Sequence, residues 1–143
     1  MSVPTLSYDS KGNLTGIGSN SYGYSSENFR KTGPGSVSLD YDPLGRLYQT
    51  SGGSTTRFQY DGTDMIAEYD GSNNMLRRYV HGPGTDEPIL EYEGSGLSNK
   101  SYLTVDERGS IVAVTNGSGT LTATNRYDEY GNPASTNAAV SAG

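Results

Sequence analysis

A short motif recurs along this chain and constrains its fold more than any other feature. The motif Tyr-Asp-Ser-Lys-Gly-Asn-Leu begins at Tyr8, and Tyr-Asp-Pro-Leu-Gly-Arg-Leu begins at Tyr41. Weaker copies begin at Tyr24, Tyr60, Tyr69 and Tyr127. The copies from Tyr8 to Tyr60 lie 16, 17 and 19 residues apart. Such self-similarity indicates a fold built from one supersecondary unit that is used several times.

Each copy of the motif predicts a hairpin turn. An Asp side chain accepts a hydrogen bond from a backbone N–H two residues further on, and a Gly three residues after it adopts positive φ without strain. Pro43 presets φ at an early position of one such turn. We therefore predict that the repeat is defined by Tyr8, Asp9, Gly12, Leu14, Tyr24, Tyr41, Asp42, Gly45, Leu47, Tyr60, Asp61, Tyr69, Asp70, Gly109, Tyr127, Asp128 and Gly131.

The residues around the motif alternate as the residues of strands do. Large side chains stand two positions apart, as in Tyr22/Tyr24 and Phe58/Tyr60, so each pair falls on one face of a strand. No stretch carries apolar residues at helical spacing. The sequence predicts an all-β fold of consecutive antiparallel β-hairpins that form a twisted, curling sheet. Its clearest hairpin covers residues 111–124.

The composition assigns the predicted core to tyrosine. Hydrophobic residues make up only 31% of the chain, while 12 Tyr supply large apolar rings. A sheet with so few aliphatic side chains depends on those rings for its stability. We therefore expect most tyrosine rings to be shielded from water.

The composition also excludes several kinds of site. The chain has no Cys and one His, which argues against disulfides, thiolate metal sites and a Ser/His/Asp triad. Its net charge of −6 and its scattered Lys and Arg predict that it does not bind nucleic acid. No apolar run reaches about 18 residues, so we expect no membrane span. We expect no catalytic residue, no cofactor and no bound metal.

The motif resembles the tyrosine-aspartate (YD) repeat of rearrangement hotspot (RHS) proteins and of teneurins. Residues 77–88, which contain Arg-Arg-Tyr-Val-His-Gly-Pro-Gly, are similar to a stretch just before the RHS-repeat-associated core. Residues 102–133, which contain Asp-Glu-Arg-Gly-Ser and Tyr-Asp-Glu-Tyr-Gly, resemble that core. The resemblance implies YD-type repeats over residues 1–80, core-like hairpins over 81–133 and a flexible tail over 134–143.

The resemblance also implies a larger assembly and a location outside the cell. Full-length members of the family form a hollow β-shell around a C-terminal cargo, often a toxin, and are secreted or displayed at the cell surface. This chain has too few repeats to close a shell. The sequence Asp-Pro-Leu-Gly from Asp42 spells part of the family's self-cleavage motif, but it lies inside a repeat and is read as a turn. We therefore carry over neither self-cleavage nor toxicity.

Several polar residues could be catalytic or metal-binding, but we favour a structural role for each. His81 is read as a loop or strand-end residue rather than as a base or a metal ligand. The acidic pairs at 86–87, 106–107 and 128–129 are read as solvated turns rather than as a glycosidase dyad. The loops at 61–64 and 70–74 offer oxygen ligands for calcium, but they match no known calcium motif.

These features predict a non-enzymatic structural module that acts as the wall or the self-associating scaffold of a secreted or surface protein. Unpaired edge strands predict self-association with another copy or with neighbouring repeats of a longer chain. An encapsulated cargo and a surface glycan are further partners to consider. The alternative is a carbohydrate-binding adhesin module that uses exposed Tyr, Asn and Asp.

Overall fold

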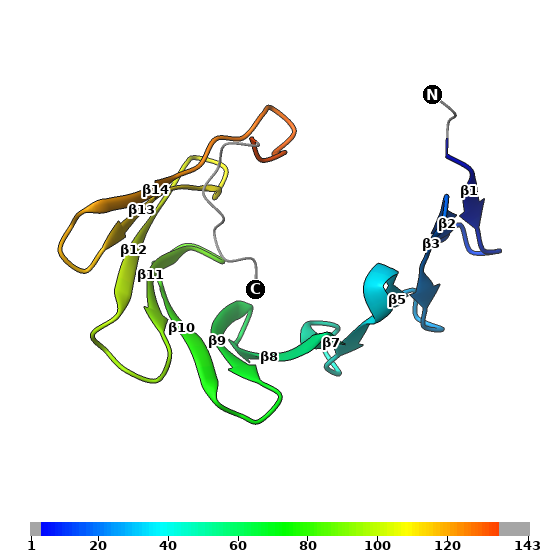
Figure 1. Cartoon of the computed structure of the whole chain (residues 1–143), viewed down its shortest axis with the longest axis horizontal. Helices are drawn as coiled ribbons and strands as arrows, with labels where there is room; N and C mark the ends of the chain where they lie inside the picture. The colour runs from blue at the N-terminus through cyan, green and yellow to red at the C-terminus, as the bar shows by residue number, and fades with distance from the viewer. Residues whose placement is uncertain (1–3, 135–143) are drawn as a thin grey trace. The chain divides into compact units, whose positions relative to one another are not determined.

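The structure is a computed structural model, and it describes residues 4–134. It is all β, and the predicted series of consecutive antiparallel hairpins is confirmed (Figure 1). The strands are β1 (Leu6–Tyr8), β2 (Leu14–Ile17), β3 (Asn20–Ser21), β4 (Gly23–Tyr24), β5 (Arg30–Gly33), β6 (Val37–Tyr41), β7 (Leu47–Gly52), β8 (Ser54–Asp61), β9 (Asp64–Asp70), β10 (Met75–His81), β11 (Pro88–Glu93), β12 (Lys100–Val105), β13 (Ile111–Asn116) and β14 (Leu121–Thr124).

The chain divides into two compact units, unit 1 over Met1–Arg57 and unit 2 over Phe58–Gly143. The predicted segments 1–80 and 81–133 describe types of sequence rather than compact units, so they stay predictions. The predicted tail lies outside the described residues from position 135 onward.

Within each unit, strands that follow one another in sequence pair with one another. In unit 1, β1, β2 and β3 form a separate three-stranded sheet, and β4 to β7 pair in chain order. In unit 2, β9 to β14 pair in chain order, and their ribbon curves strongly (Figure 1). This purely sequential pairing is what short turns between adjacent strands require.

Seven turns share one hydrogen-bond pattern, and we call them anchored turns. At Asp9, for example, Oδ1 accepts hydrogen bonds from the backbone N–H groups of Lys11 and Asn13. The Gly12 N–H donates to the Asp9 carbonyl, and the φ of Gly12 is +84°. A positive φ at this position completes a type I turn with a bulge, which suits the twist of a hairpin. The anchors are Asp9, Ser25, Asp42, Asp70, Asp106, Asn116 and Asp128.

The predicted tyrosine core is wrong. The buried apolar side chains of the described residues are Leu39, Phe58 and Ala67. All 12 tyrosines are half-buried or exposed, and Tyr130 is 82% exposed. The described residues contain no α-helix that could cover a face of the sheet. The tyrosine rings therefore remain partly open to solvent.

The sequence also led to expectations about a membrane span and about pairing with another copy. Among residues 4–134 there is no helix with the length and apolar character needed to cross a membrane. The expected pairing of edge strands with another copy is not tested by a single chain, and it stays a prediction.

Candidate functional site

Five side chains of unit 2 form a cluster on one face of β9, β10 and β11. The register pairs Arg77 with both Glu68 and Glu93, and it pairs Tyr79 with Glu91. Paired residues lie on the same face, and residues two apart on a strand also share a face. We call Glu68, Arg77, Tyr79, Glu91 and Glu93 the carboxylate cluster.

Glu68 is the most buried member of the cluster. Its side chain is only 2% exposed. Its Oε1 accepts a hydrogen bond of 2.5 Å from the Tyr79 hydroxyl, and its Oε2 accepts one of 3.2 Å from Arg77 Nη1. Arg77 Nε donates a second hydrogen bond, of 2.9 Å, to Glu93. A buried charge is tolerated only with such partners, so Glu68 depends on both Tyr79 and Arg77.

The cluster carries more negative charge than its single arginine offsets. Burial raises the pKa of Glu91, and the neighbouring Glu93 and Glu68 raise it further. Burial and the hydrogen bond to Glu68 also raise the pKa of Tyr79. The Arg77 pKa is raised as well, because its bond to Glu93 and the nearby carboxylates outweigh the opposing effect of burial. Glu91 therefore keeps its proton to a higher pH than an ordinary glutamate does.

A second concave site lies between two anchored turns of unit 2. It is a hollow of about 440 Å³, lined by Asp106, Glu107, Arg108, Ser110, Val112, Arg126, Tyr127, Asp128, Glu129 and Gly131. Arg108 Nη1 bridges the two turns with a hydrogen bond of 3.1 Å to the Glu129 carbonyl. Hydrogen bonds from Asn132 lower the pKa of Asp128. Four acidic residues against two arginines leave this hollow unsuited to a phosphate.

The described residues offer no evident place for a metal ion. No group of three or more His, Cys, Asp or Glu side chains within residues 4–134 is arranged to hold one. In the acidic pair at 86–87, Glu87 accepts the Gly84 N–H, and Asp64 accepts the N–H of Asp86. These carboxylates order their loop.

The structure places most of the predicted repeat residues at the anchored turns. Asp9, Asp42, Asp70, Asp106 and Asp128 are anchors, and Gly12, Gly45, Gly109 and Gly131 take the positive φ. The copy at Tyr60 differs, because β8 ends at Asp61 and only Gly62 and Thr63 separate it from β9. Tyr69 pairs with Met75 across the turn anchored by Asp70. Leu14 and Leu47 open the strands that leave their turns.

The sequence interpretation missed the carboxylate cluster. Its members were not selected, since no motif joins Glu68 to residues nine and eleven positions further along the chain. The usable signal was the alternation of Arg77/Tyr79 and of Glu91/Glu93 in two adjacent strands. Reading it requires the register between those strands, which a single sequence does not supply.

Comparison with known proteins gives relatives of one kind. No family model matches the chain. The tRNA nuclease WapA of Bacillus subtilis (strain 168) is 30% identical over an alignment that covers 94% of this chain. The tRNA3(Ser)-specific nuclease WapA of Bacillus spizizenii and the tRNA(Glu)-specific nuclease WapA of Bacillus subtilis subsp. natto are each 29% identical over the same share of the chain. The chain spans about 6% of the length of these relatives.

These relatives overturn three expectations. They are named as WapA nucleases and not as RHS or teneurin proteins, so the family assignment drawn from the motif is wrong. Their names also contradict a non-enzymatic structural module or adhesin, and with it the expectation that the protein is not an enzyme. The physical reason is that a repeated turn specifies local geometry, and local geometry carries no information on the chemistry of the protein that contains it.

Proposed function

We propose that this chain is a segment of a nuclease that cleaves tRNA. The observation that carries the proposal is the extent of the similarity. Three relatives whose names are those of tRNA nucleases align with 94% of the chain. The similarity therefore extends through both units and is not confined to one turn.

The ionisable side chains of the segment bear on whether the segment itself cleaves RNA. Cleavage of RNA needs a group that accepts a proton and positive groups that offset the charge of the phosphate. Burial and the neighbouring Glu93 raise the pKa of Glu91, but a raised pKa does not by itself make Glu91 a catalytic group. Arg77 is already engaged by Glu68 and Glu93. We therefore attribute tRNA cleavage to the whole protein and assign no residue of this segment to the breaking of the bond.

We further propose that the protein is secreted or displayed at the cell surface. A nuclease that attacks tRNA would stop protein synthesis in the cell that makes it, so export keeps the activity away from the producer's own tRNA. Fractionation of producing cells into cytoplasm, envelope and medium tests this, and protein confined to the cytoplasm would contradict it.

The function is tested with the longest natural protein that carries this segment. The purified protein is incubated with total tRNA, ribosomal RNA and duplex DNA, with and without Mg²⁺, and the products are resolved on denaturing gels. The proposal expects shortened tRNA and intact duplex DNA. Intact tRNA in the presence of folded protein under both conditions would overturn it.

A further inference from the structure

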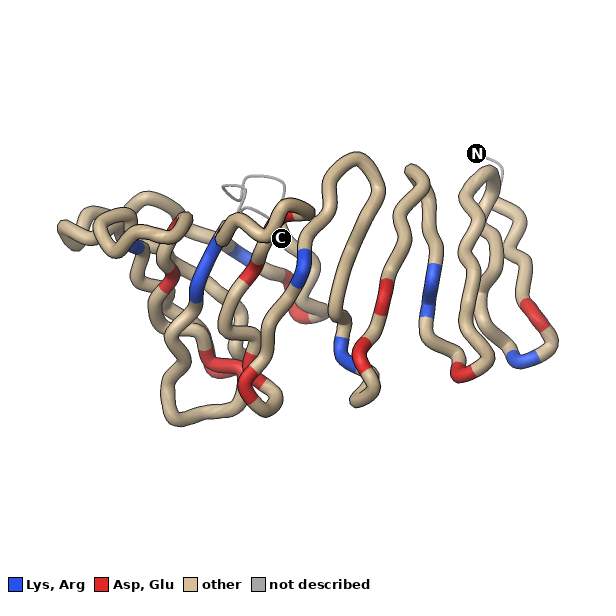
Figure 2. Tube along the Cα trace, turned by 90° about the horizontal axis from the view of Figure 1, so that it is seen from below, with Lys and Arg blue, Asp and Glu red and all other residues tan. Residues whose placement is uncertain are grey.

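The charged residues of β10, β11 and β12 are sorted by face. The register pairs Arg78 with Tyr92 and Tyr92 with Lys100, so these three side chains form one row across three strands. Glu91 and Glu93 alternate with Tyr92 and therefore lie on the opposite face, with Arg77. Figure 2 shows basic and acidic positions close together along these strands, and the register assigns them to opposite faces.

A second row runs beside the first on the same face. Successive registers join Val80 to Leu90, Leu90 to Tyr102, Tyr102 to Thr115 and Thr115 to Leu121. The exposed fractions are 44% for Val80, 42% for Tyr102 and 57% for Leu121. The row is therefore an apolar strip, open to solvent, across five strands of unit 2.

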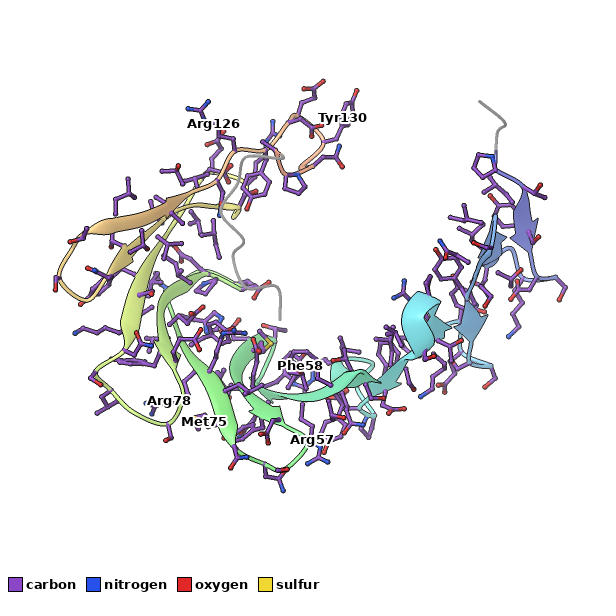
Figure 3. All side chains as sticks on the ribbon, in the orientation of Figure 1. Arg57, Phe58, Met75, Arg78, Arg126 and Tyr130 are labelled. Atoms are coloured by element: carbon purple, nitrogen blue, oxygen red, sulfur yellow. The ribbon has the colours of Figure 1, made fainter. Side chains whose placement is uncertain are left out.

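The cations of this face lie against its aromatic rings. The Arg78 guanidinium carbon is 5.2 Å from the centre of the Tyr92 ring, and Lys100 Nζ is 5.7 Å from the centre of the Tyr102 ring. Arg78 Nη2 also donates a hydrogen bond of 2.9 Å to the Gly96 carbonyl, while Arg78 Nε is buried (Arg78 is labelled in Figure 3). We call Arg78, Tyr92, Lys100 and Tyr102, together with the apolar strip, the cation–tyrosine face.

We propose that the cation–tyrosine face binds unpaired RNA, such as a loop of tRNA. Proteins hold single-stranded nucleic acid by stacking bases on aromatic side chains and by placing Lys or Arg beside the phosphates. Here the exposed Tyr102 ring supplies the stacking surface, and Lys100 and Arg78 supply the charge. The inference rests on the proposed function, because tRNA is the RNA that appears in the names of the relatives.

The net charge of −6 is a property of the whole chain and does not describe how charge is distributed between the two faces of this sheet. The acidic side chains of β11 point away from it, and β10, β12, β13 and β14 contain no Asp or Glu. A sum over the whole composition cannot show this separation. The expectation that the chain binds no nucleic acid rested on the net charge and on the scattered Lys and Arg, and the pairing of Lys100 and Arg78 with tyrosine rings on one face is the observation set against it.

The test measures binding of a fluorescent unpaired RNA oligonucleotide and of intact tRNA to the full 143-residue chain by anisotropy. We expect Tyr102→Ala to weaken binding of both RNAs by about fivefold or more, as for other stacking residues. We expect Lys100→Gln to reduce the slope of log affinity against log salt by about 0.7, the effect of one phosphate contact. Tyr48→Ala is the matched control, because Tyr48 is a strand tyrosine that is 47% exposed in unit 1.

The outcomes separate this inference from the proposed function. Circular dichroism first checks that each variant keeps the wild-type fold. Absence of RNA binding by the wild-type chain would overturn the inference, as would unchanged affinity in both variants. Equal competition by poly-glutamate would also overturn it, because the face would then be a general anion or peptide surface. Cleavage of tRNA by the longer protein would stand in each case.

Discussion

The Tyr41 hydroxyl donates a hydrogen bond of 2.9 Å to the backbone carbonyl of Arg30. Tyr41 directly precedes the anchor Asp42, and Arg30 lies five residues beyond the anchor Ser25. Tyr24 and Tyr127 make the same contact with the carbonyls of Leu14 and Ile111, at 3.0 Å and 3.2 Å. In these three copies of the motif the tyrosine thus joins its anchored turn to an earlier strand through its hydroxyl, while its ring stays half-exposed.

This contact predicts a loss of stability when the hydroxyl alone is removed. Tyr41→Phe keeps the ring stacked on Phe29, whose centre lies 4.8 Å away, and removes only the donor. We expect the free energy of unfolding of unit 1 to fall by about 1 kcal/mol. Urea unfolding measures it. Tyr48→Phe, which alters an exposed ring, should leave the midpoint unchanged, and equal effects of the two variants would contradict the account.

Two glycines at the same turn position should respond differently to alanine. Gly12 and Gly45 have φ of +84° and +80°, so each alanine suffers left-handed strain of about 1–2 kcal/mol. A Cβ at Gly45 would also lie 2.9 Å from Phe29 Cζ, whereas a Cβ at Gly12 meets nothing within 4 Å. Gly45→Ala should therefore lower the free energy of unfolding of unit 1 more than Gly12→Ala does. The reverse order in urea unfolding would refute this explanation.

The anchored turns predict a loss of stability in acid. The pKa of Asp9 is lowered by hydrogen bonds from Asn13, and that of Asp42 is lowered by Arg46 and Leu44 against the opposing effect of burial. A folded-state pKa below the unfolded value of about 3.9 gives stability that is present above that pH and is lost as the pH falls through the folded pKa. The free energy of unfolding should therefore decline below about pH 4.

Asp42→Asn isolates the contribution of one anchor to this decline. Asn116 already anchors a turn with its side-chain oxygen, so the amide preserves the acceptor. The variant should unfold with a weaker dependence on pH below about 4 than the wild type shows. An unchanged pH profile would show that the Asp42 carboxylate does not contribute to the dependence.

Glu91 predicts a pH effect of the opposite sign. Its pKa is raised in the folded state, so its contribution to stability is present below the unfolded pKa of about 4.3 and is lost as the pH rises through the folded pKa. Glu91→Gln should therefore unfold at higher urea concentration than the wild type at pH about 7, and the difference should shrink toward pH about 4. Glu27→Gln, at an exposed turn position, is the control, and a destabilised Glu91→Gln at neutral pH would contradict the prediction.

The buried Glu68 makes Tyr79 important for the stability of unit 2. Tyr79→Phe removes the donor to a carboxylate that is 2% exposed and leaves Arg77 as its side-chain partner among residues 4–134. Hydrogen bonds to charged groups contribute about 1.5–3 kcal/mol, and we expect a loss of that size. Hydrogen exchange of β9 and β10 amides reports it, and unchanged protection would contradict the assigned role of the hydroxyl.

Local geometry could be predicted from this sequence, and charge placement could not. Asp42 and Gly45 mark their turn because the carboxylate and the positive φ are properties of single residues. Ser25 with Asn28 forms the same turn without either signature residue, so the motif alone understates the repeat. The predicted tyrosine core is wrong because a large ring can stay half-exposed on a sheet, as the rings of Tyr24 and Tyr41 do while their hydroxyls donate to backbone carbonyls. The opposite faces of Arg78 and Glu91 depend on register, which a single sequence leaves open.

The membership of this segment in a tRNA nuclease is tested most directly by sequencing tRNA ends. The longest natural protein that carries the segment is incubated with total tRNA, and the new termini are mapped over time. The account predicts termini at defined positions in tRNA that accumulate with time. A terminus profile identical to that of the protein-free sample would contradict it.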